Sequence, residues 1–226
     1  MFNLKSITTI AFITLLAGCV SPPPPHDYTA FKQADPHSII ILPPLNNTPE
    51  IIASSSVMTQ MVAPIAESGF YVFPVAVVEQ TFKGNGLTVA SDVHKVPVKK
   101  LHDIFGADTA LYITIEEYGT NYVVISSETA VTVSASLVDL RTGDVLWKDK
   151  ARASSAEQQS NNSGGGLIGM LVVAAINQIA ETVTDKGFEI AAIASTRLLS
   201  SDAYNGLLHG PRSPNYGKPV VSEKKQ

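Results

Sequence analysis

The chain has 226 residues, of which 45% are hydrophobic and 16% are charged, with a formal net charge of −4 and one cysteine. This apolar content is sufficient for one domain with a full core. The charge distribution does not favour nucleic-acid binding, because the sequence has no run of basic residues longer than the pair Lys224 and Lys225. The single cysteine excludes a disulfide within the chain.

The N-terminus has the pattern of a secretory signal peptide over residues 1–18. A short positive start precedes an apolar run at 7–16, which is too short to span a ~30 Å hydrocarbon core. The ending Leu16-Ala17-Gly18-Cys19 resembles the bacterial lipobox, which implies cleavage between Gly18 and Cys19 and a diacylglycerol on the Cys19 sulfur. The alternatives are an ordinary cleavage site with an incidental cysteine and an N-terminal membrane anchor.

Residues 19–37 are predicted to form a Pro-rich tether. The four prolines at 22–25 favour polyproline II, a semi-rigid spacer of ~3.1 Å per residue. A disordered segment would have nearly the same reach, so both interpretations remain open. In either case the tether would hold the folded part away from a bilayer.

The folded domain is predicted to cover residues 38–200. Its first strand is the apolar run 39–42, which two prolines end and which is typical of a strand buried on both faces. Thr48 is predicted to cap a helix that Gly69 ends. The apolar residues expected on the buried face of this helix are Ile51, Met58, Met61, Val62 and Ile65. A short strand at 70–73 and a helical turn at 74–82 follow.

A polar loop, with room for a short helix within it, is predicted at 83–96, and a further helix is predicted at 98–105. Leu101, Ile104 and Phe105 are expected to point inward, and Gly106 is expected to cap this helix. Alternating apolar residues predict strands at 111–116 and 131–137, separated by a turn at 119–121. The sequence Arg141-Thr142-Gly143-Asp144 predicts a hairpin turn into a strand at 145–147. An antiparallel meander over about 109–153 should result.

The last third of the chain is predicted to be mainly helical. A Ser/Asn/Gln/Gly-rich loop at 153–166 precedes helices at 167–184 and 186–199, and the tail at 201–226 should be irregular. The buried face of the second helix is expected to contain Ile190, Ile193, Ala194 and Leu198.

Several motifs that could carry chemistry are weak in this chain. Ser54, Ser55 and Ser56 lack a nucleophile-elbow motif and are better interpreted as a small-residue patch for close helix packing. The five histidines are scattered, with no metal-ligand spacing: His26, His37, His94, His102 and His209. Glycines 164–166 lack the Lys-Ser/Thr pair of a phosphate-binding loop. We therefore expect no catalytic, metal-binding or cofactor-binding residues.

The stretch 167–176 is apolar nearly all round a helix. Three interpretations remain open: a helix buried in the core, a surface for a second protein chain, or a segment that dips into lipid. The residues of the possible partner surface are Leu167, Ile168, Met170, Leu171, Val172 and Val173.

Four segments together resemble a family of bacterial lipoproteins typified by a neisserial surface antigen. They are residues 41–48 entering a helix, residues 105–108 before a strand, the hairpin at 137–147, and the ending 206–211. The hairpin and the Gly-Ala-Asp turn are similar to segments of the curli secretion channel subunit, the lipoprotein activator of penicillin-binding proteins, and the TolB N-terminal domain. The resemblance implies a single α/β domain with a mixed sheet and packing helices, and it supplies no catalytic residues.

These observations lead to two hypotheses of different classes. The first is a non-enzymatic envelope lipoprotein, an accessory or scaffold subunit of a secretion, transport or cell-envelope assembly. Its expected contacts are the membrane through Cys19, another envelope lipoprotein of curli-channel type, and a possible second copy. The absence of Asp at position 20, where Val20 stands, points to the outer membrane, with the periplasmic face favoured. The alternative is a periplasmic ligand-binding protein or enzyme with a pocket near loop 83–96.

Overall fold

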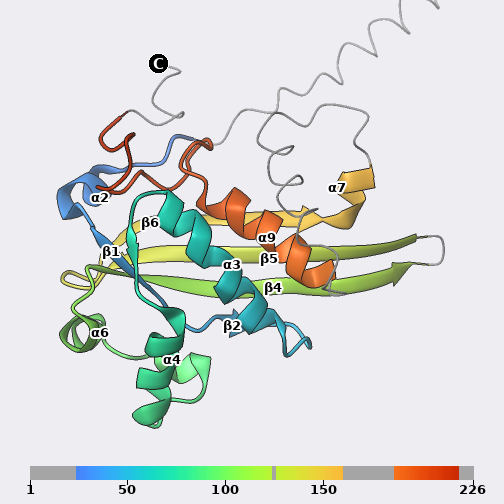
Figure 1. The fold of residues 1–226 in the computed structure, drawn as a ribbon, viewed down its shortest axis with the longest axis horizontal. Helices are drawn as coiled ribbons and strands as arrows, with labels where there is room; N and C mark the ends of the chain where they lie inside the picture. The colour runs from blue at the N-terminus through green and yellow to red at the C-terminus, as the bar shows by residue number, and fades with distance from the viewer. Residues whose placement is uncertain (1–23, 124–125, 160–185, 219–226) are drawn as a thin grey trace, which may run out of the picture.

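The computed structural model describes residues 24–123, 126–159 and 186–218, arranged around one sheet (Figure 1). The strands are β1 (Ser38–Ile41), β2 (Leu45–Asn46), β3 (Tyr71–Val72), β4 (Thr109–Val123), β5 (Ser126–Asp139) and β6 (Val145–Ser154). The helices are α2 (Thr29–Ala34), α3 (Ala53–Glu67), α4 (Val75–Gly84), α5 (Ala90–Val93), α6 (Val98–Phe105), α7 (Ser155–Gln159) and α9 (Lys186–Leu199). The mixed α/β fold predicted from the sequence is confirmed.

The sheet combines a parallel half with an antiparallel half. Its strand order is β3-β1-β4-β5-β6, and β2 pairs with β4 beyond the end of β1. Strand β1 is parallel to β3 and β4, whereas β4, β5 and β6 form the predicted antiparallel meander. The crossovers from β1 to β3 and from β3 to β4 run in opposite directions along the sheet. Because such crossovers are right-handed, their helices cover opposite faces.

Strand β1 separates two hydrophobic cores. Ile39 and Ile41 face the core under α3 and α9, whereas Ile40 and Leu42 face the core under α4, α5 and α6, and all four are fully buried. This confirms the prediction of a strand buried on both faces. The larger core continues along the meander through Ile113, Val133 and Trp147, among others.

Strand β4 is much longer than the sequence predicts. The predicted turn at 119–121 is wrong, because β4 stays paired with β5 from Thr109 to Val123. Gly119 has a φ of 122°, which a side-chain-bearing residue rarely adopts, and a register shift lies between Ile115 and Glu117. The turn signal therefore marks an irregularity within a strand.

Two other boundaries differ from the predictions. Strand β6 continues to Ser154 and α7 follows directly, so the predicted loop at 153–166 begins too early. Helix α6 has its predicted bounds and a left-handed Gly106 cap, but Ile104 is exposed and does not point into the core. Helix α9 matches its prediction, with Ile190, Ala194 and Leu198 buried.

The two ends of the described chain pack on the domain. Tyr28 and Phe31 are buried, and the Tyr28 hydroxyl donates a hydrogen bond to the Gly206 carbonyl at 2.6 Å. The second half of the predicted tether is therefore part of the folded domain. Residues 201–218 contain no helix or strand, as predicted for this part of the tail, yet Leu207 is fully buried in the larger core.

Side chains contact three backbone groups on the outer edge of β6. Strand β6 pairs only with β5, so its other edge would otherwise present free backbone groups. Three contacts meet it: His26 Nε2 with the Leu146 carbonyl, the Asp149 carboxylate with the Lys150 N–H, and the Arg197 guanidinium with the Arg152 carbonyl.

Candidate functional site

The site residues predicted from the sequence lie outside the described residues. This applies to Gly18 and Cys19 and to the possible partner surface at 167–173. Their roles stay predictions. The site that the structure itself presents lies elsewhere, in the connection between β2 and α3.

The side chain of Asn46 organises this connection. Its Oδ1 accepts hydrogen bonds from the Thr48 N–H at 3.0 Å and the Thr48 hydroxyl at 2.8 Å, and its Nδ2 donates to the Glu50 carbonyl at 2.8 Å. The Asn47 N–H donates to the Ile115 carbonyl on β4 at 3.0 Å. Such side-chain-to-backbone bonds build an ordered turn that competes with helix formation.

This turn displays two adjacent isoleucines, and we call residues 46–53 the isoleucine turn. Ile51 is 94% exposed and Ile52 is 52% exposed, because α3 begins only at Ala53. The prediction that Ile51 packs on the buried face of the helix is wrong. Thr48 does not cap α3 either, since its hydroxyl accepts from the Glu50 N–H at 3.3 Å within the turn.

The exposure of Ile51 and Ile52 suits a binding surface. Single exposed apolar residues are common on protein surfaces, but two neighbouring branched side chains on a hydrogen-bonded turn form a preorganised contact. Burial of one isoleucine in a partner would contribute roughly 1.5–3 kcal/mol. The sequence contains a usable signal, because an Asn-x-Thr-Pro turn followed by Glu50 precedes the two isoleucines.

The isoleucine turn rests on β4 at Gly119. A Cβ atom built on Gly119 would lie 3.3 Å from Cγ of Glu50, closer than most such contacts. The glycine thus leaves room for the turn to lie over the strand. The predicted chain reversal at this glycine is replaced by a close approach between two segments.

The face of the meander opposite α3 and α9 is polar over the part of β4 that follows Tyr112. Lys150 on β6 pairs with Glu116 on β4, and this hydrogen bond lowers the pKa of Glu116. Glu117 accepts from the Thr132 hydroxyl at 2.8 Å and from Arg152 Nε at 3.1 Å. Because these charges pair across the strands, a partner on this face would have to compete with them. The isoleucine turn is the better candidate.

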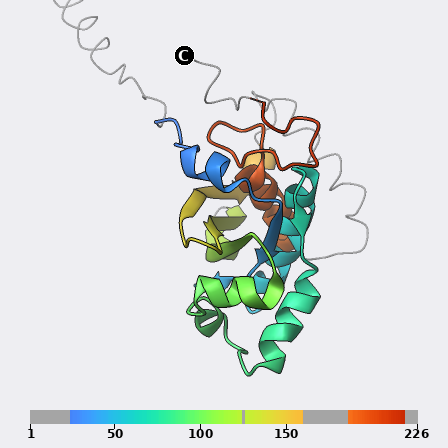
Figure 2. The same ribbon diagram turned by 90° about the vertical axis from the view of Figure 1, so that its left-hand side faces the viewer.

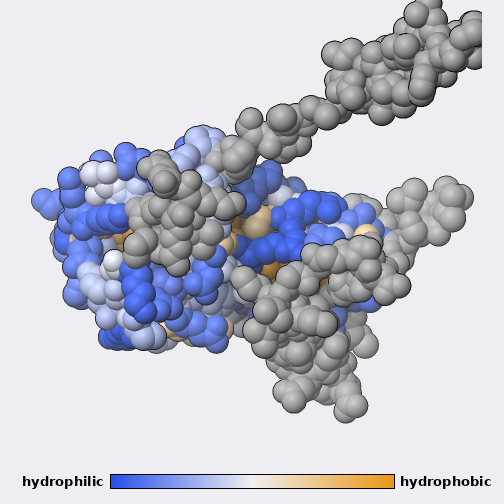
Figure 3. Space-filling view, turned by 90° about the horizontal axis from the view of Figure 1, so that it is seen from above, coloured by the Kyte–Doolittle hydropathy of each residue, from blue (hydrophilic) through white to orange (hydrophobic). Residues whose placement is uncertain are grey.

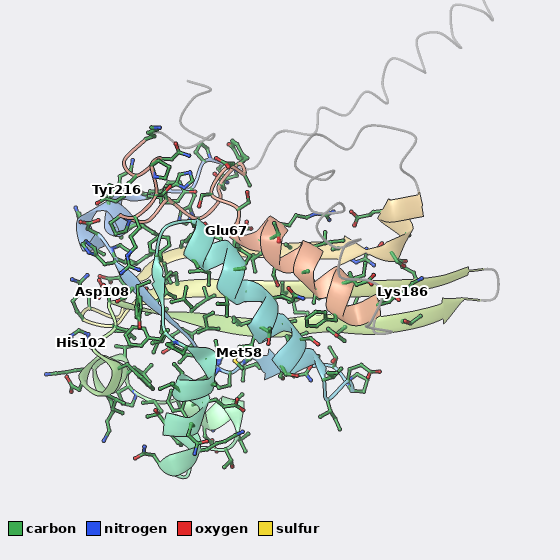
Figure 4. All side chains as sticks on the ribbon, viewed as in Figure 1. Met58, Glu67, His102, Asp108, Lys186 and Tyr216 are labelled. Carbon is green, nitrogen blue, oxygen red and sulfur yellow. The ribbon has the colours of Figure 1, made fainter. Side chains whose placement is uncertain are left out.

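The histidines lie apart and have structural contacts. His94 Nε2 is 2.9 Å from the Pro43 carbonyl oxygen, and burial lowers the pKa of His94. His102 Nδ1 is 2.8 Å from the Ala107 carbonyl oxygen. Figure 4 shows His102 at one end of the sheet and Lys186 at the other. Within the described ranges, no group of three His, Cys, Asp or Glu residues could hold a metal ion.

A cavity of 280 Å³ lies between α2 and the β5–β6 turn, away from loop 83–96. Two of its charged groups pair with each other, because Arg141 Nη2 donates to Asp139 at 2.8 Å. The same nitrogen donates to the Ala34 carbonyl at 2.7 Å. Leu87, Val93 and Val96 of loop 83–96 pack instead on the smaller core. This cavity therefore does not correspond to the pocket that the sequence predicts near loop 83–96.

The fold is a single mixed α/β domain, and its isoleucine turn is exposed. No helix among the residues described is both long and apolar enough to span a membrane. The chain belongs to the family described as "Putative lipoprotein GNA1162-like", whose model matches residues 26–212. Membership implies a lipid-anchored protein of the cell envelope and indicates no enzyme family.

The chain is similar to several individual proteins, and the first two below support this assignment. A Neisseria meningitidis serogroup B protein, "Putative lipoprotein NMB1124/NMB1162", is 48% identical over 207 residues, which cover 91% of this chain and 95% of the relative. The crystal structure of lipoprotein GNA1162 from Neisseria meningitidis is 50% identical with a TM-score of 0.52, covering 64% of this chain and 99% of the other. A PelC dodecamer structure from Paraburkholderia phytofirmans is 13% identical, with a TM-score of 0.42 over 72% of this chain and 86% of the other.

Proposed function

We propose that the protein is a lipid-anchored accessory subunit of a cell-envelope assembly and acts by binding another envelope protein, without catalysis. The observation that carries this proposal is the isoleucine turn, where Asn46 and Thr48 hold Ile51 almost fully exposed. An ordered apolar contact of this kind has a use in recognition and none in acid–base or metal chemistry.

The anchor would be the Cys19 sulfur, after cleavage between Gly18 and Cys19. The lipobox-like sequence and the lipoprotein family support it. Val20 favours the outer membrane, and we place the domain on its periplasmic face. Lipid on the cysteine would act together with the short apolar contact to bring two envelope proteins together on one surface.

The partner we propose is a second envelope lipoprotein of curli-channel type, on the strength of the resemblance carried by residues 105–108 and 137–147. A second copy of this chain is the competing occupant. The apolar residues 167–173 would supply a further contact in either complex.

In-cell photo-crosslinking tests this proposal. A photoreactive amino acid at position 51 should give a discrete adduct in intact cells, and mass spectrometry should identify a lipoprotein in it. The matched control is position 145, because Val145 is also exposed, at 54%, but lies on β6. Equal adducts at both positions, or none at position 51, would contradict the proposal, and an adduct of doubled mass would identify a second copy instead.

A matched pair of substitutions gives the energetic test. Ile51→Asp should reduce recovery of the partner roughly tenfold or more, because an isoleucine burial of about 1.5–3 kcal/mol is lost and a charge is introduced. Val145→Asp should leave recovery unchanged. Both side chains are exposed, so neither variant should unfold the domain.

A further inference from the structure

We propose that the surface formed by residues 24–37 and 201–218 lies directly against the bilayer, while α4, α5 and α6 point away from it. The partner of this surface is the lipid headgroup layer. The inference rests on the proposed lipid anchor at Cys19 and goes beyond it, because it fixes which side of the domain faces the membrane.

The length of chain between the anchor and the fold carries the inference. Five residue steps separate Cys19 from Pro24, the first described residue. A fully extended chain spans at most about 3.6 Å per residue, so this connection cannot exceed roughly 18 Å. A folded chain of this size is roughly 40 Å across. The domain therefore cannot turn its far side to the membrane.

The start of the described chain is fixed to the domain by Asn205. Its Nδ2 donates to the Pro24 carbonyl at 2.9 Å, and its Oδ1 accepts from the His26 N–H at 2.9 Å. The buried Tyr28 hydroxyl adds the 2.6 Å bond to the Gly206 carbonyl. Asn205 has a φ of 60°, so the tail turns sharply where it meets these residues. Residues 24–28, the described residues nearest to Cys19, are thus held at a defined point on the domain.

The elements divide between two opposite sides around this point. Figures 1 and 2 both show α2 and residues 201–218 on the upper side of the sheet, whereas α4 and α6 lie on the lower side. Figure 3 looks down on the upper side, and its described residues are mostly hydrophilic. A hydrophilic surface would contact headgroups and would not insert into the hydrocarbon.

The charges on this surface are balanced. Three acidic and three basic side chains are exposed there: Asp27, Asp35, Asp202, Lys32, Arg212 and Lys218. An excess of Lys and Arg would attract the surface to an anionic leaflet, and this surface has no such excess. The short covalent connection, and not electrostatic attraction, is what would hold the surface at the membrane.

Energy transfer to labelled lipid tests the orientation in the lipidated full-length protein. Because the only native cysteine carries the lipid, one introduced cysteine can carry a donor dye. Gln33→Cys on α2 and Gln80→Cys on α4 form a matched pair, since both glutamines are exposed. In phosphatidylethanolamine–phosphatidylglycerol vesicles with a headgroup acceptor, transfer from position 33 should exceed that from position 80 at least about threefold, given the ~40 Å domain. Equal or reversed transfer would overturn the inference.

Two further measurements separate its possible failures. Flotation with the vesicles reports the anchor itself, so protein that fails to float contradicts the proposed function, whereas floating protein with equal transfer contradicts only the orientation. A flexible Gly/Ser insert of about 20 residues between Ser21 and Pro22 adds roughly 25 Å of reach. It should lower transfer from position 33 without affecting flotation. Transfer that survives the insert, or that high salt abolishes, would show that the tether does not impose the orientation.

Discussion

Tyr118 on β4 donates a hydrogen bond to the hydroxyl of Ser56 on α3, with 3.0 Å between the two oxygens. The ring of the same tyrosine lies against the first turn of α9, where a Cβ on Gly187 would come within 2.7 Å of its Cε1 atom. One side chain therefore joins the sheet to both helices of the larger core. Of the predicted small-residue patch at 54–56, Ser56 is buried at this contact, whereas Ser55 is exposed.

Tyr118→Phe should lower the free energy of unfolding by about 1 kcal/mol, the usual net value of a buried hydrogen bond. The ring packing is retained, so the loss of stability comes from the missing hydroxyl alone. Urea denaturation measures this change in the free energy of unfolding. Tyr216→Phe is the control, because that exposed hydroxyl bonds to Asp35 at the surface and should cost less. A Tyr118→Phe variant as stable as the native protein would show that the buried bond contributes nothing.

Gly187→Ala should destabilise the domain by about 1–3 kcal/mol, the usual cost of forcing an extra methyl group into a packed site. The new Cβ would collide with the Tyr118 ring, which α3 and the sheet hold in place. Gly84→Ala at the end of α4 is the matched change, since nothing lies within 4 Å of its Cβ. Thermal unfolding of the two variants should differ clearly, and equal midpoints would contradict the close approach.

The His94 side chain predicts a loss of stability on mild acidification. Burial lowers its pKa below the ordinary 6.5, so the folded protein takes up a proton less readily than the unfolded chain. The contribution of neutral His94 to the free energy of unfolding is therefore fully present above pH 6.5. It declines as the pH falls towards the pKa of His94 in the folded protein. His94→Gln should flatten this decline in denaturation curves. Parallel curves for the variant and the native protein would refute the assignment.

Asp139 predicts a second decline at lower pH. Burial raises its pKa, but the Arg141 side chain and the N–H groups of Arg141 and Thr142 outweigh that effect and hold the pKa below 3.8. Its contribution is present above pH 3.8 and is lost as the pH falls through the folded pKa. Asp139→Asn should cost about 1–3 kcal/mol near neutral pH, and this difference should shrink in acid. Asp144→Asn, exposed in the same turn, should cost little.

Cys19→Ser should abolish lipid attachment and release the protein from the membrane fraction. The sulfur is the predicted acceptor of the diacylglycerol, and no other cysteine can replace it. Metabolic labelling with a fatty acid and fractionation of envelopes measure both effects. A control Ser21→Ala variant should stay lipidated. Continued membrane retention of Cys19→Ser would argue for an uncleaved N-terminal membrane anchor.

Elements defined by local signals were predicted well from the sequence. Strand β1 follows from an apolar run between polar and proline residues, and α6 follows from its periodicity and the Gly106 cap. The antiparallel meander follows from alternation at 131–137 and the turn at 141–144. In each case the sequence signal lies within a few consecutive residues.

Features that depend on distant contacts could not be predicted. The burial of Tyr28 depends on Gly206, 178 residues away, so a proline-rich segment appeared to be a simple tether. Residues 119–121 have the composition of a turn, but Gly119 instead makes room for Glu50 from another segment. Ile51 matches the helical spacing to Met58, yet the bonds of Asn46 end that periodicity before α3 begins.

The three contacts along the outer edge of β6 also determine how copies of the protein can meet. An open strand edge recruits a strand from another molecule, and repeated recruitment leads to fibrous aggregates. Here His26, Asp149 and Arg197 already bond to backbone groups of that edge. Molecules crowded on a membrane surface would therefore meet a β6 edge where three backbone groups already have side-chain partners, which disfavours strand pairing between copies.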